Sequence, residues 1–399
     1  MGGASPLASH LGKYNQQEGV VAIDFDQRPI LVFWESTRAC LLACKHCRAE
    51  AMPHPAPGEL SPSEGLRFLD SLTAFGRPYP VLIMTGGDVL MRPDAFTLIE
   101  HARELGIPVG LAPSVTPKLT DEAIARFADL GGAIVSLSLD GANAATHEGI
   151  RGVADHFDAT VKALELLVAA GFTVQVNTVV MRDNVAELPA IAQILKDVGV
   201  KVWEVFFLIP VGRGQDVGAL DAQASEDVCH LLYDASAYDL IVRTVEGPFF
   251  RRVVGWRKAQ GPDINASPAQ IARQYGLGTL YTTLAEELRE RLGPPRSAPR
   301  AQSTGTRDGK GIIFVAHNGV VYPAGFLPLA LGNVRERDIV SIYREDPLLQ
   351  DIRASRFSGA CGRCDYRDSC GGSRARAFAL TGDPLGEDAA CVMTPDSVR

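Results

Sequence analysis

Three cysteines near the N-terminus carry the side chains of this chain best suited to chemistry. Cys40, Cys44 and Cys47 are separated by three and then two residues, and they directly follow the apolar run 30–34. A loop with this spacing can wrap one inorganic centre and offer it three soft sulfur ligands, which iron-sulfur clusters and zinc prefer. Structural zinc sites and fully ligated four-iron clusters take four protein ligands, so three thiols leave one metal position open for chemistry.

A second group of thiols lies near the other end of the chain. Of the eight cysteines, only Cys229 is solitary, and the last four are Cys361, Cys364, Cys370 and Cys391. Four thiols can close a metal site completely, as an iron-sulfur cluster without an open iron or as a zinc knot. The chain does not open on a secretory pattern, so we expect a cytoplasmic protein whose cysteines are metal ligands rather than disulfides.

The motif Cys40-x3-Cys44-x2-Cys47 after a first strand resembles the signature of the radical S-adenosylmethionine (SAM) superfamily. The resemblance implies a catalytic 4Fe-4S cluster on these thiols, with SAM on the open iron. In that family the reduced cluster cleaves SAM, and a 5′-deoxyadenosyl radical takes hydrogen from the substrate. A low-potential electron donor such as flavodoxin or ferredoxin is implied as a partner. His46 stands at the position, usually aromatic, beside the adenine.

The elements that must position this loop alternate regularly between residues 29 and 214. Strands are predicted at 30–35, 81–85, 109–112, 134–139, 174–180 and 202–208, and helices near 62–75, 94–105, 121–130, 156–170 and 185–198. Ser61-Pro62-Ser63-Glu64 is a capping box for the first helix. Apolar strands that alternate with helices indicate a parallel sheet buried on both faces. The fold class is therefore α/β, a partial (β/α)6 TIM barrel, which the resemblance also implies.

Polar residues follow the predicted strands at the edge where catalytic groups gather in parallel α/β folds. The turn Gly86-Gly87-Asp88 resembles the glycine-glycine-acid motif that holds the SAM ammonium group in the family. The other candidates for SAM contacts are Ser114, Ser138, Asp140, Arg151 and Asn177. Hydroxyls satisfied by backbone, and capping or a plain salt bridge for Arg151, are the alternatives. Arg213, after the sixth strand, can anchor the following loop.

Residues 311–399 resemble the SPASM domain, the auxiliary-cluster extension of many radical SAM enzymes. A hairpin is predicted at 312–322, with Asn318-Gly319 as its turn. The cysteines then follow, but Arg374 stands where the fourth member of the Cys-x2-Cys-x5-Cys-x3-Cys run would be. Ala324 likewise stands where a cysteine often follows the hairpin. The resemblance and these departures imply one auxiliary 4Fe-4S cluster, on Cys361, Cys364, Cys370 and Cys391, and a zinc knot is the alternative.

The chain divides into four predicted parts: an N-terminal arm (1–28), the radical SAM barrel (29–214), a variable linker or lid (215–310) and the SPASM-like domain (311–399). A net charge of −8 without any local basic run argues against nucleic acid as a partner. No apolar stretch approaches the length of a bilayer span, so no membrane partner is expected either.

The Cys370 to Cys391 region looks most like the radical SAM enzymes of heme d1 synthesis and the alternative heme pathway. The leading hypothesis is thus a radical SAM enzyme that modifies a tetrapyrrole side chain. A maturase of a ribosomally made peptide is the nearest alternative. A non-catalytic iron-sulfur or zinc protein, for electron transfer or binding, is the alternative from another class.

Overall fold

One curved sheet organises the chain. The structure is a computed structural model of the 399-residue chain and describes residues 24–130, 134–260, 266–295, 297–302 and 305–393. Its strands are β1 Leu31–Thr37, β2 Val81–Gly86, β3 Val109–Leu111, β4 Ile134–Ser138, β5 Thr173–Val180, β6 Val202–Phe207, β7 Ile241–Val245, β8 Ile312–Val315, β9 Val320–Tyr322 and β10 Gly332–Asn333. In the described part of the chain they form a single sheet with the order β10-β9-β8-β1-β2-β3-β4-β5-β6-β7.

The strands from β8 through β1 to β7 all run parallel, whereas β9 and β10 pair antiparallel at one end. The predicted partial barrel is confirmed, and the six predicted strands are β1 to β6. The parallel run is longer than expected, because β7 and β8 extend it at its two ends. All these strands therefore present their carboxyl ends at the same edge, where βα loops build sites.

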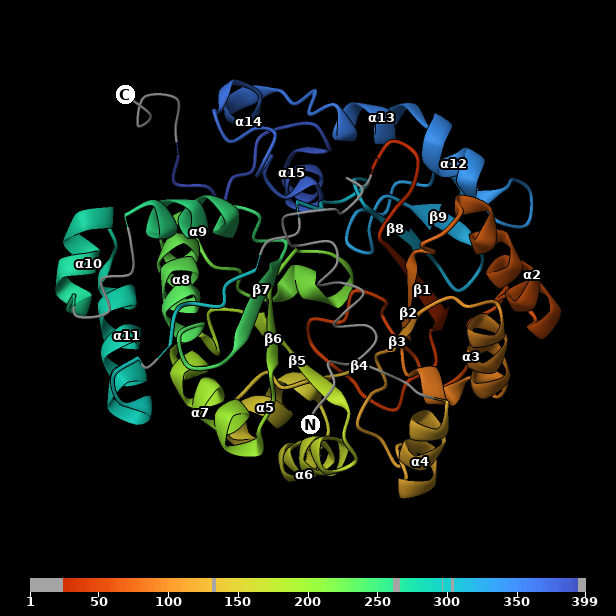
Figure 1. The fold of residues 1–399 in the computed structure, drawn as a ribbon, viewed down its shortest axis with the longest axis horizontal. Helices are drawn as coiled ribbons and strands as arrows, with labels where there is room; N and C mark the ends of the chain where they lie inside the picture. The colour runs from red at the N-terminus through yellow and green to blue at the C-terminus, as the bar shows by residue number, and fades with distance from the viewer. Residues whose placement is uncertain (1–23, 131–133, 261–265, 296, 303–304, 394–399) are drawn as a thin grey trace.

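Helices surround the outer face of the sheet, and the blue C-terminal helices α12 to α15 lie together along one side of the molecule (Figure 1). The helices are α2 Pro62–Leu72, α3 Ala95–Glu104, α4 Asp121–Asp129, α5 Ala144–Arg151, α6 His156–Ala169, α7 Leu188–Val198, α8 Ala222–Ala235, α9 Phe250–Ala259, α10 Pro268–Tyr275, α11 Thr279–Leu292, α12 Ile339–Glu345, α13 Pro347–Arg353, α14 Gly359–Arg363 and α15 Arg374–Thr381. Trp34 of β1 is fully buried and meets Phe68 of α2 edge to face at 5.1 Å. The core therefore lies between the sheet and this outer layer.

Two local signals in the sequence act as predicted. The Ser61 hydroxyl accepts from the Glu64 backbone N–H, and the Ser61 N–H donates to the Glu64 carboxylate, so the capping box starts α2. The hairpin of β8 and β9 turns at Asn318-Gly319, where Gly319 has φ of +82°. Glycine adopts this left-handed conformation without the clash that a Cβ atom would cause.

The segment 215–310 contains regular structure beyond the helix and short strand that its sequence indicates. Besides α8 and β7 it holds α9, α10 and α11, and α11 packs against α7 and α8. The start of α10 is encoded locally in the sequence, because Ser267 and Gln270 form a second capping box there. Residues 1–23 of the predicted arm lie outside the described residues. The division of the chain into four parts stays a prediction.

Candidate active site

The cysteine loop runs from the end of β1 across the carboxyl edge of the sheet. Cys40 and Cys44 are buried, Cys47 is partly buried, and all three line one cavity of about 240 Å³. Each Sγ atom accepts a hydrogen bond from an N–H group: Leu42 donates to Cys40 (3.4 Å), Arg151 to Cys44 (3.6 Å) and Ala51 to Cys47 (3.4 Å). When a thiolate ligates iron, hydrogen bonds of this kind to its sulfur stabilise and tune the iron-sulfur cluster.

The donor set fits a cluster rather than a single ion. Within the described ranges, no three His, Cys, Asp or Glu side chains converge where one metal ion would bind. A four-iron cluster does not need such a point, because each of its thiolate ligands binds a separate iron. Three soft sulfurs beside a common cavity, each already bonded to an N–H donor, match that requirement.

The two glycines after β2 hold the cysteine loop against the sheet. Gly87 donates its N–H to Thr37 O at 2.8 Å, and Asp88 donates its N–H to Ala39 O at 2.7 Å. A Cβ atom on Gly86 would lie 2.2 Å from Thr37 O, and one on Gly87 would lie 2.3 Å from Ala39 O. No side chain fits at these distances, so Gly86 and Gly87 allow the cysteine loop to lie close against the end of β2.

Asp88 is fully buried and does not line the cavity. Its carboxylate accepts from the backbone N–H groups of Leu90 and Ser114 and from the Thr116 hydroxyl, at 3.1, 3.2 and 2.7 Å. Burial raises the pKa of Asp88, against these hydrogen bonds. The Ser114 hydroxyl in turn donates to Gly87 O at 3.0 Å and lies on the cavity. Asp88 therefore positions the loop that carries Ser114 rather than facing the cavity itself.

A buried ion cluster forms behind the cysteine loop. The Asp140 carboxylate lies 2.7 Å from the Arg151 guanidinium and 3.3 Å from His46 Nε2, and it accepts the Val179 N–H at 2.8 Å. Burial alone would raise the pKa of Asp140, but the charges of Arg151 and His46 bring it well below its usual range. Arg151 also donates to Cys44, so three sequence-predicted residues and a thiol meet here.

Two histidines extend this cluster to the loop after β3. The Asp140 backbone N–H donates to His147 Nδ1 at 3.1 Å, so neutral His147 carries its proton on Nε2 and donates to His156 Nδ1 at 2.8 Å. His156 Nε2 then donates to Val115 O at 2.9 Å. Burial first, and Arg151 second, lower the pKa of His147 to about 3. His156 lines the cavity and was not foreseen, because a histidine at a helix start carries no specific signal.

Four polar side chains lie in one row across the strands of the barrel. Ser138 of β4 is in register with Asn177 of β5, Asn177 with Glu204 of β6, and Glu204 with Arg243 of β7. Ser138 and Asn177 line the cavity. Gln175 joins the row, since its amide donates to Asn177 at 2.8 Å and to Glu204 at 3.0 Å. Glu204 and Arg243 were missed, although a single charged residue in a largely apolar strand signals an interior partner.

The charged groups on the cavity wall are cationic. The cavity is lined by the side chains of Arg48, Arg151 and Arg213, and by no aspartate or glutamate among the described residues. The Glu35 carboxylate does not line the cavity; it pairs with the Arg48 guanidinium at 2.5 Å and with His317 Nδ1 at 2.8 Å. Arg213 instead donates to the carbonyls of Cys44 and Ala51 at 2.9 and 3.1 Å, which anchors the cysteine loop. His46, Gly86 and Gly87 complete the predicted residues on this wall.

Of the C-terminal cysteines, Cys361 lies in α14, and Cys364, Cys370 and Cys391 lie between α14 and the end of the described chain. Cys370 is buried, while Cys361, Cys364 and Cys391 are partly buried. Cys361 Sγ accepts from the Asp388 N–H at 3.4 Å and from Arg374 at 3.6 Å, and Cys364 Sγ accepts from the Tyr366 N–H at 3.3 Å. These thiols, too, have N–H donors of the kind that metal-bound sulfur takes.

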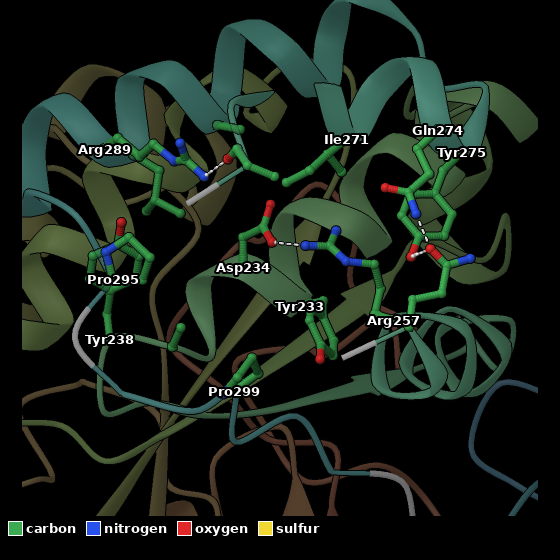
Figure 2. A pocket seen from close by; sticks show the side chains of 15 residues that line it. Tyr233, Asp234, Tyr238, Arg257, Ile271, Gln274, Tyr275, Arg289, Pro295 and Pro299 are labelled. Carbon is green, nitrogen blue, oxygen red and sulfur yellow. Dashed lines mark hydrogen bonds and ion pairs between the residues drawn. The ribbon is translucent and has the colours of Figure 1, made fainter. Parts of the chain in front are cut away.

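A second cavity, of about 160 Å³, lies among α8, α9, α10 and α11, away from both cysteine groups (Figure 2). Asp234 and Arg257 point toward one another in it and form an ion pair, and Asp234 also accepts from Tyr281. Arg289 donates to Ala266 O at 2.6 Å. Because these lining charges already bond to the protein, we assign no chemistry to this cavity.

Comparison with known proteins identifies the class. The family model of the radical SAM superfamily matches residues 34–195, which hold the cysteine loop. The AdoMet-dependent heme synthase of Oleidesulfovibrio alaskensis is 33% identical over 369 residues, which cover 92% of this chain and 87% of that protein. The chain belongs to the radical SAM superfamily. It is an enzyme that uses SAM and a 4Fe-4S cluster, which excludes the non-catalytic alternative.

Other relatives span the branches considered from the sequence. The mycofactocin maturase MftC of Mycobacterium tuberculosis is 30% identical over 370 residues, which cover 91% of this chain and 83% of that protein. The crystal structure of Streptococcus suis SuiB bound to S-adenosylmethionine covers 97% of this chain and 80% of that one, with a TM-score of 0.61 and 15% identity, and shares the fold. No described helix combines the length and the apolar character needed to cross a membrane.

Proposed function

We propose that this enzyme modifies a carboxylate-bearing side chain of a heme-type tetrapyrrole. The observation that carries the proposal is the cavity wall beside the three thiols, where the charged lining residues are Arg48, Arg151 and Arg213. Arg48 and Arg151 already pair with Glu35 and Asp140, so the unpaired positive charge on this wall is that of Arg213, which forms no ion pair among the described residues and has a buried Nη2 without a hydrogen-bond partner. Arginine pairs with carboxylates in two-pronged geometry, so this charge favours an anionic ligand. The likeness to a heme synthase over 92% of the chain supports a tetrapyrrole as that ligand.

Roles for the predicted residues follow from their positions. Cys40, Cys44 and Cys47 would ligate the catalytic cluster, which together with SAM supplies a 5′-deoxyadenosyl radical when reduced. The cavity-lining candidates for direct SAM contact are His46, Gly86, Gly87, Ser114, Ser138, Arg151 and Asn177. Asp88 and Asp140 would act indirectly, through the groups they bond. The protein's contribution is to orient one substrate C–H bond and exclude competing reactions.

The C-terminal thiols are proposed to hold one auxiliary 4Fe-4S cluster. Cys361, Cys364, Cys370 and Cys391 supply four ligands, so this centre would have no open iron. We infer that a low-potential protein such as flavodoxin or ferredoxin supplies electrons, and that the enzyme works in the cytoplasm, where its thiols stay reduced.

Anaerobic reconstitution tests the proposal. After loading with iron and sulfide we expect about eight irons per chain, four for each cluster. With dithionite, SAM and an iron porphyrin that carries propionate side chains, we expect 5′-deoxyadenosine and a porphyrin of changed mass. Cys44→Ser should abolish both products, whereas Cys229→Ser, a thiol in α8 outside both groups, should retain them. Deoxyadenosine formation by Cys44→Ser at the unmodified rate would contradict the assigned ligands.

Peptide maturation is the second candidate, favoured by the 30% identity to a mycofactocin maturase. It predicts SAM cleavage without any change in the mass of the porphyrin. It also predicts binding of a ribosomal precursor peptide, which a tetrapyrrole enzyme would not bind.

A further inference from the structure

Positive charge is concentrated around the C-terminal cysteines, and the carboxylates of Asp308 and Asp368 act on it from beyond ion-pair distance. Arg307 and Arg374 are buried, with exposed fractions of 5% and 0%, and Arg251 is partly buried beside them. None of these three forms an ion pair with a carboxylate in the described chain. Neighbouring arginines differ, since Arg376 pairs with Asp388 at 3.0 Å. Buried charges are normally paired, so the three call for an anion.

The three guanidinium groups bond to the backbone of the cysteine loops. Arg307 donates to the carbonyls of Arg367 (3.1 Å) and Asp368 (2.6 Å). Arg251 donates to the carbonyls of Ser369 (3.0 Å) and Thr306. Arg374 donates to the carbonyls of Gly372 (3.3 Å), Pro384 (3.1 Å) and Gly386 (2.6 Å). Apart from Thr306, the residues that supply these carbonyls lie between Cys364 and Cys370, just after Cys370, and before Cys391. The arginines therefore hold all the segments that carry the thiols.

Direct contact with the ligand set comes from Arg374, which also donates to Cys361 Sγ at 3.6 Å. It occupies the sequence position of the missing fourth cysteine. The Phe357 ring brings the groups together, because the guanidinium carbons of Arg374 and Arg307 lie 4.4 and 5.3 Å from its centroid. At the sequence position where the SPASM run would have its fourth cysteine ligand, this chain therefore has the positively charged Arg374.

The neighbouring positive charges make it less favourable for Arg307 to carry its own charge. Burial first, and the charge of Arg251 next, lower the pKa of Arg307 to about 10, and Arg374 adds to this. This penalty on the Arg307 charge is relieved when an anionic group lies beside the guanidinium.

We propose that Arg251, Arg307 and Arg374, here called the arginine clamp, supply the counter-charge for the iron-sulfur centre on the C-terminal thiols and raise its reduction potential. Four thiolates give a 4Fe-4S centre a net negative charge, and added positive charge nearby favours the reduced form. This inference rests on the auxiliary centre of the proposed function.

The test isolates that centre in the full chain. Cys40→Ala, Cys44→Ala and Cys47→Ala together remove the N-terminal ligands, and we expect about four irons to remain. In this background Arg307→Gln removes a clamp charge, Arg307→Lys keeps it, and Arg363→Gln removes an exposed charge from the same cysteine segment. Circular dichroism and thermal melting confirm folding of each variant.

Redox titration followed by electron paramagnetic resonance gives the readout. We expect Arg307→Gln to shift the reduction equilibrium about tenfold toward the oxidised form, or about 59 mV for one electron. Arg307→Lys and Arg363→Gln should stay near the parent value. An unchanged potential in a folded, iron-loaded Arg307→Gln protein overturns the clamp alone. A background that binds zinc or no iron overturns the auxiliary centre and the clamp with it.

Discussion

Replacing Asp140 by asparagine removes the negative charge on which the cavity wall depends. Asp140 is fully buried and balances the Arg151 guanidinium at 2.7 Å and His46 at 3.3 Å. In Asp140→Asn the amide oxygen can still accept the Val179 N–H. The Arg151 charge, however, stays buried beside Cys44 without a carboxylate.

The expected loss of stability follows from that uncompensated charge. Breaking a buried ion pair by removal of one partner costs about 3–5 kcal/mol. Because the Val179 bond can survive, we expect about 3 kcal/mol for Asp140→Asn. Asp351→Asn is the matched control, since Asp351 pairs with Arg356 at 2.6 Å on the surface. Exposed pairs of this kind contribute about 0–1 kcal/mol.

Urea denaturation of the metal-free chain near pH 7 measures both values by linear extrapolation. The pKa of Asp140 is lowered in the folded chain, so its contribution is present above the unfolded pKa of about 3.9 and is lost only as the pH falls below it. Equal costs for Asp140→Asn and Asp351→Asn would refute the buried-charge reasoning. As a further check, Asp140→Asn with Arg151→Met should cost less than the sum of the single changes.

Four further substitutions test other parts of the structure. Gly87→Ala should lower the iron retained by the cysteine loop, which iron analysis measures, because the added Cβ meets Ala39 O at 2.3 Å. Gly149→Ala in α5 is the control: its Cβ meets open space, so the substitution should raise the free energy of unfolding by about 0.5–1 kcal/mol in urea melts. The pKa of His147 is lowered to about 3 in the folded chain, so below about pH 6.5 the unfolded chain binds a proton that the folded chain does not. The free energy of unfolding therefore falls by up to about 1.4 kcal/mol per pH unit as the pH is lowered. His147→Gln should flatten that slope in denaturation at several pH values. Ser61→Ala should cost about 1 kcal/mol in the same assay, through loss of the α2 cap.

The sequence was sufficient for features that are local or periodic. The six strands alternate in a recognisable way, and the capping box at Ser61 and the turn at Asn318-Gly319 depend only on neighbouring residues. The cysteine motif is local as well, so its place after β1 was predictable. Local chemistry and the two-residue period of strands explain these successes.

Contacts between distant segments could not be read from the chain. The spacing at Asp88 indicates an acid beside two glycines, but only the folded structure shows its carboxylate bonded to Thr116. The pairing of Glu204 with Gln175 depends on the register of β5 and β6, which a single sequence does not fix. His156 reaches the cavity because α6 begins there, and no residue near it in sequence announces this.

The two cysteine groups differ in how their nearby arginines are balanced. Beside the N-terminal thiols, Arg151 and Arg48 are paired with Asp140 and Glu35, so these pairs add little net charge near that cluster. Beside the C-terminal thiols, the arginines of the clamp form no ion pair among the described residues and bond to backbone carbonyls instead. An iron-sulfur centre in the second environment is therefore easier to reduce than the same centre in the first. If the C-terminal thiols hold the proposed auxiliary cluster, this charge distribution would give that cluster the higher reduction potential and would leave the lower one to the N-terminal cluster.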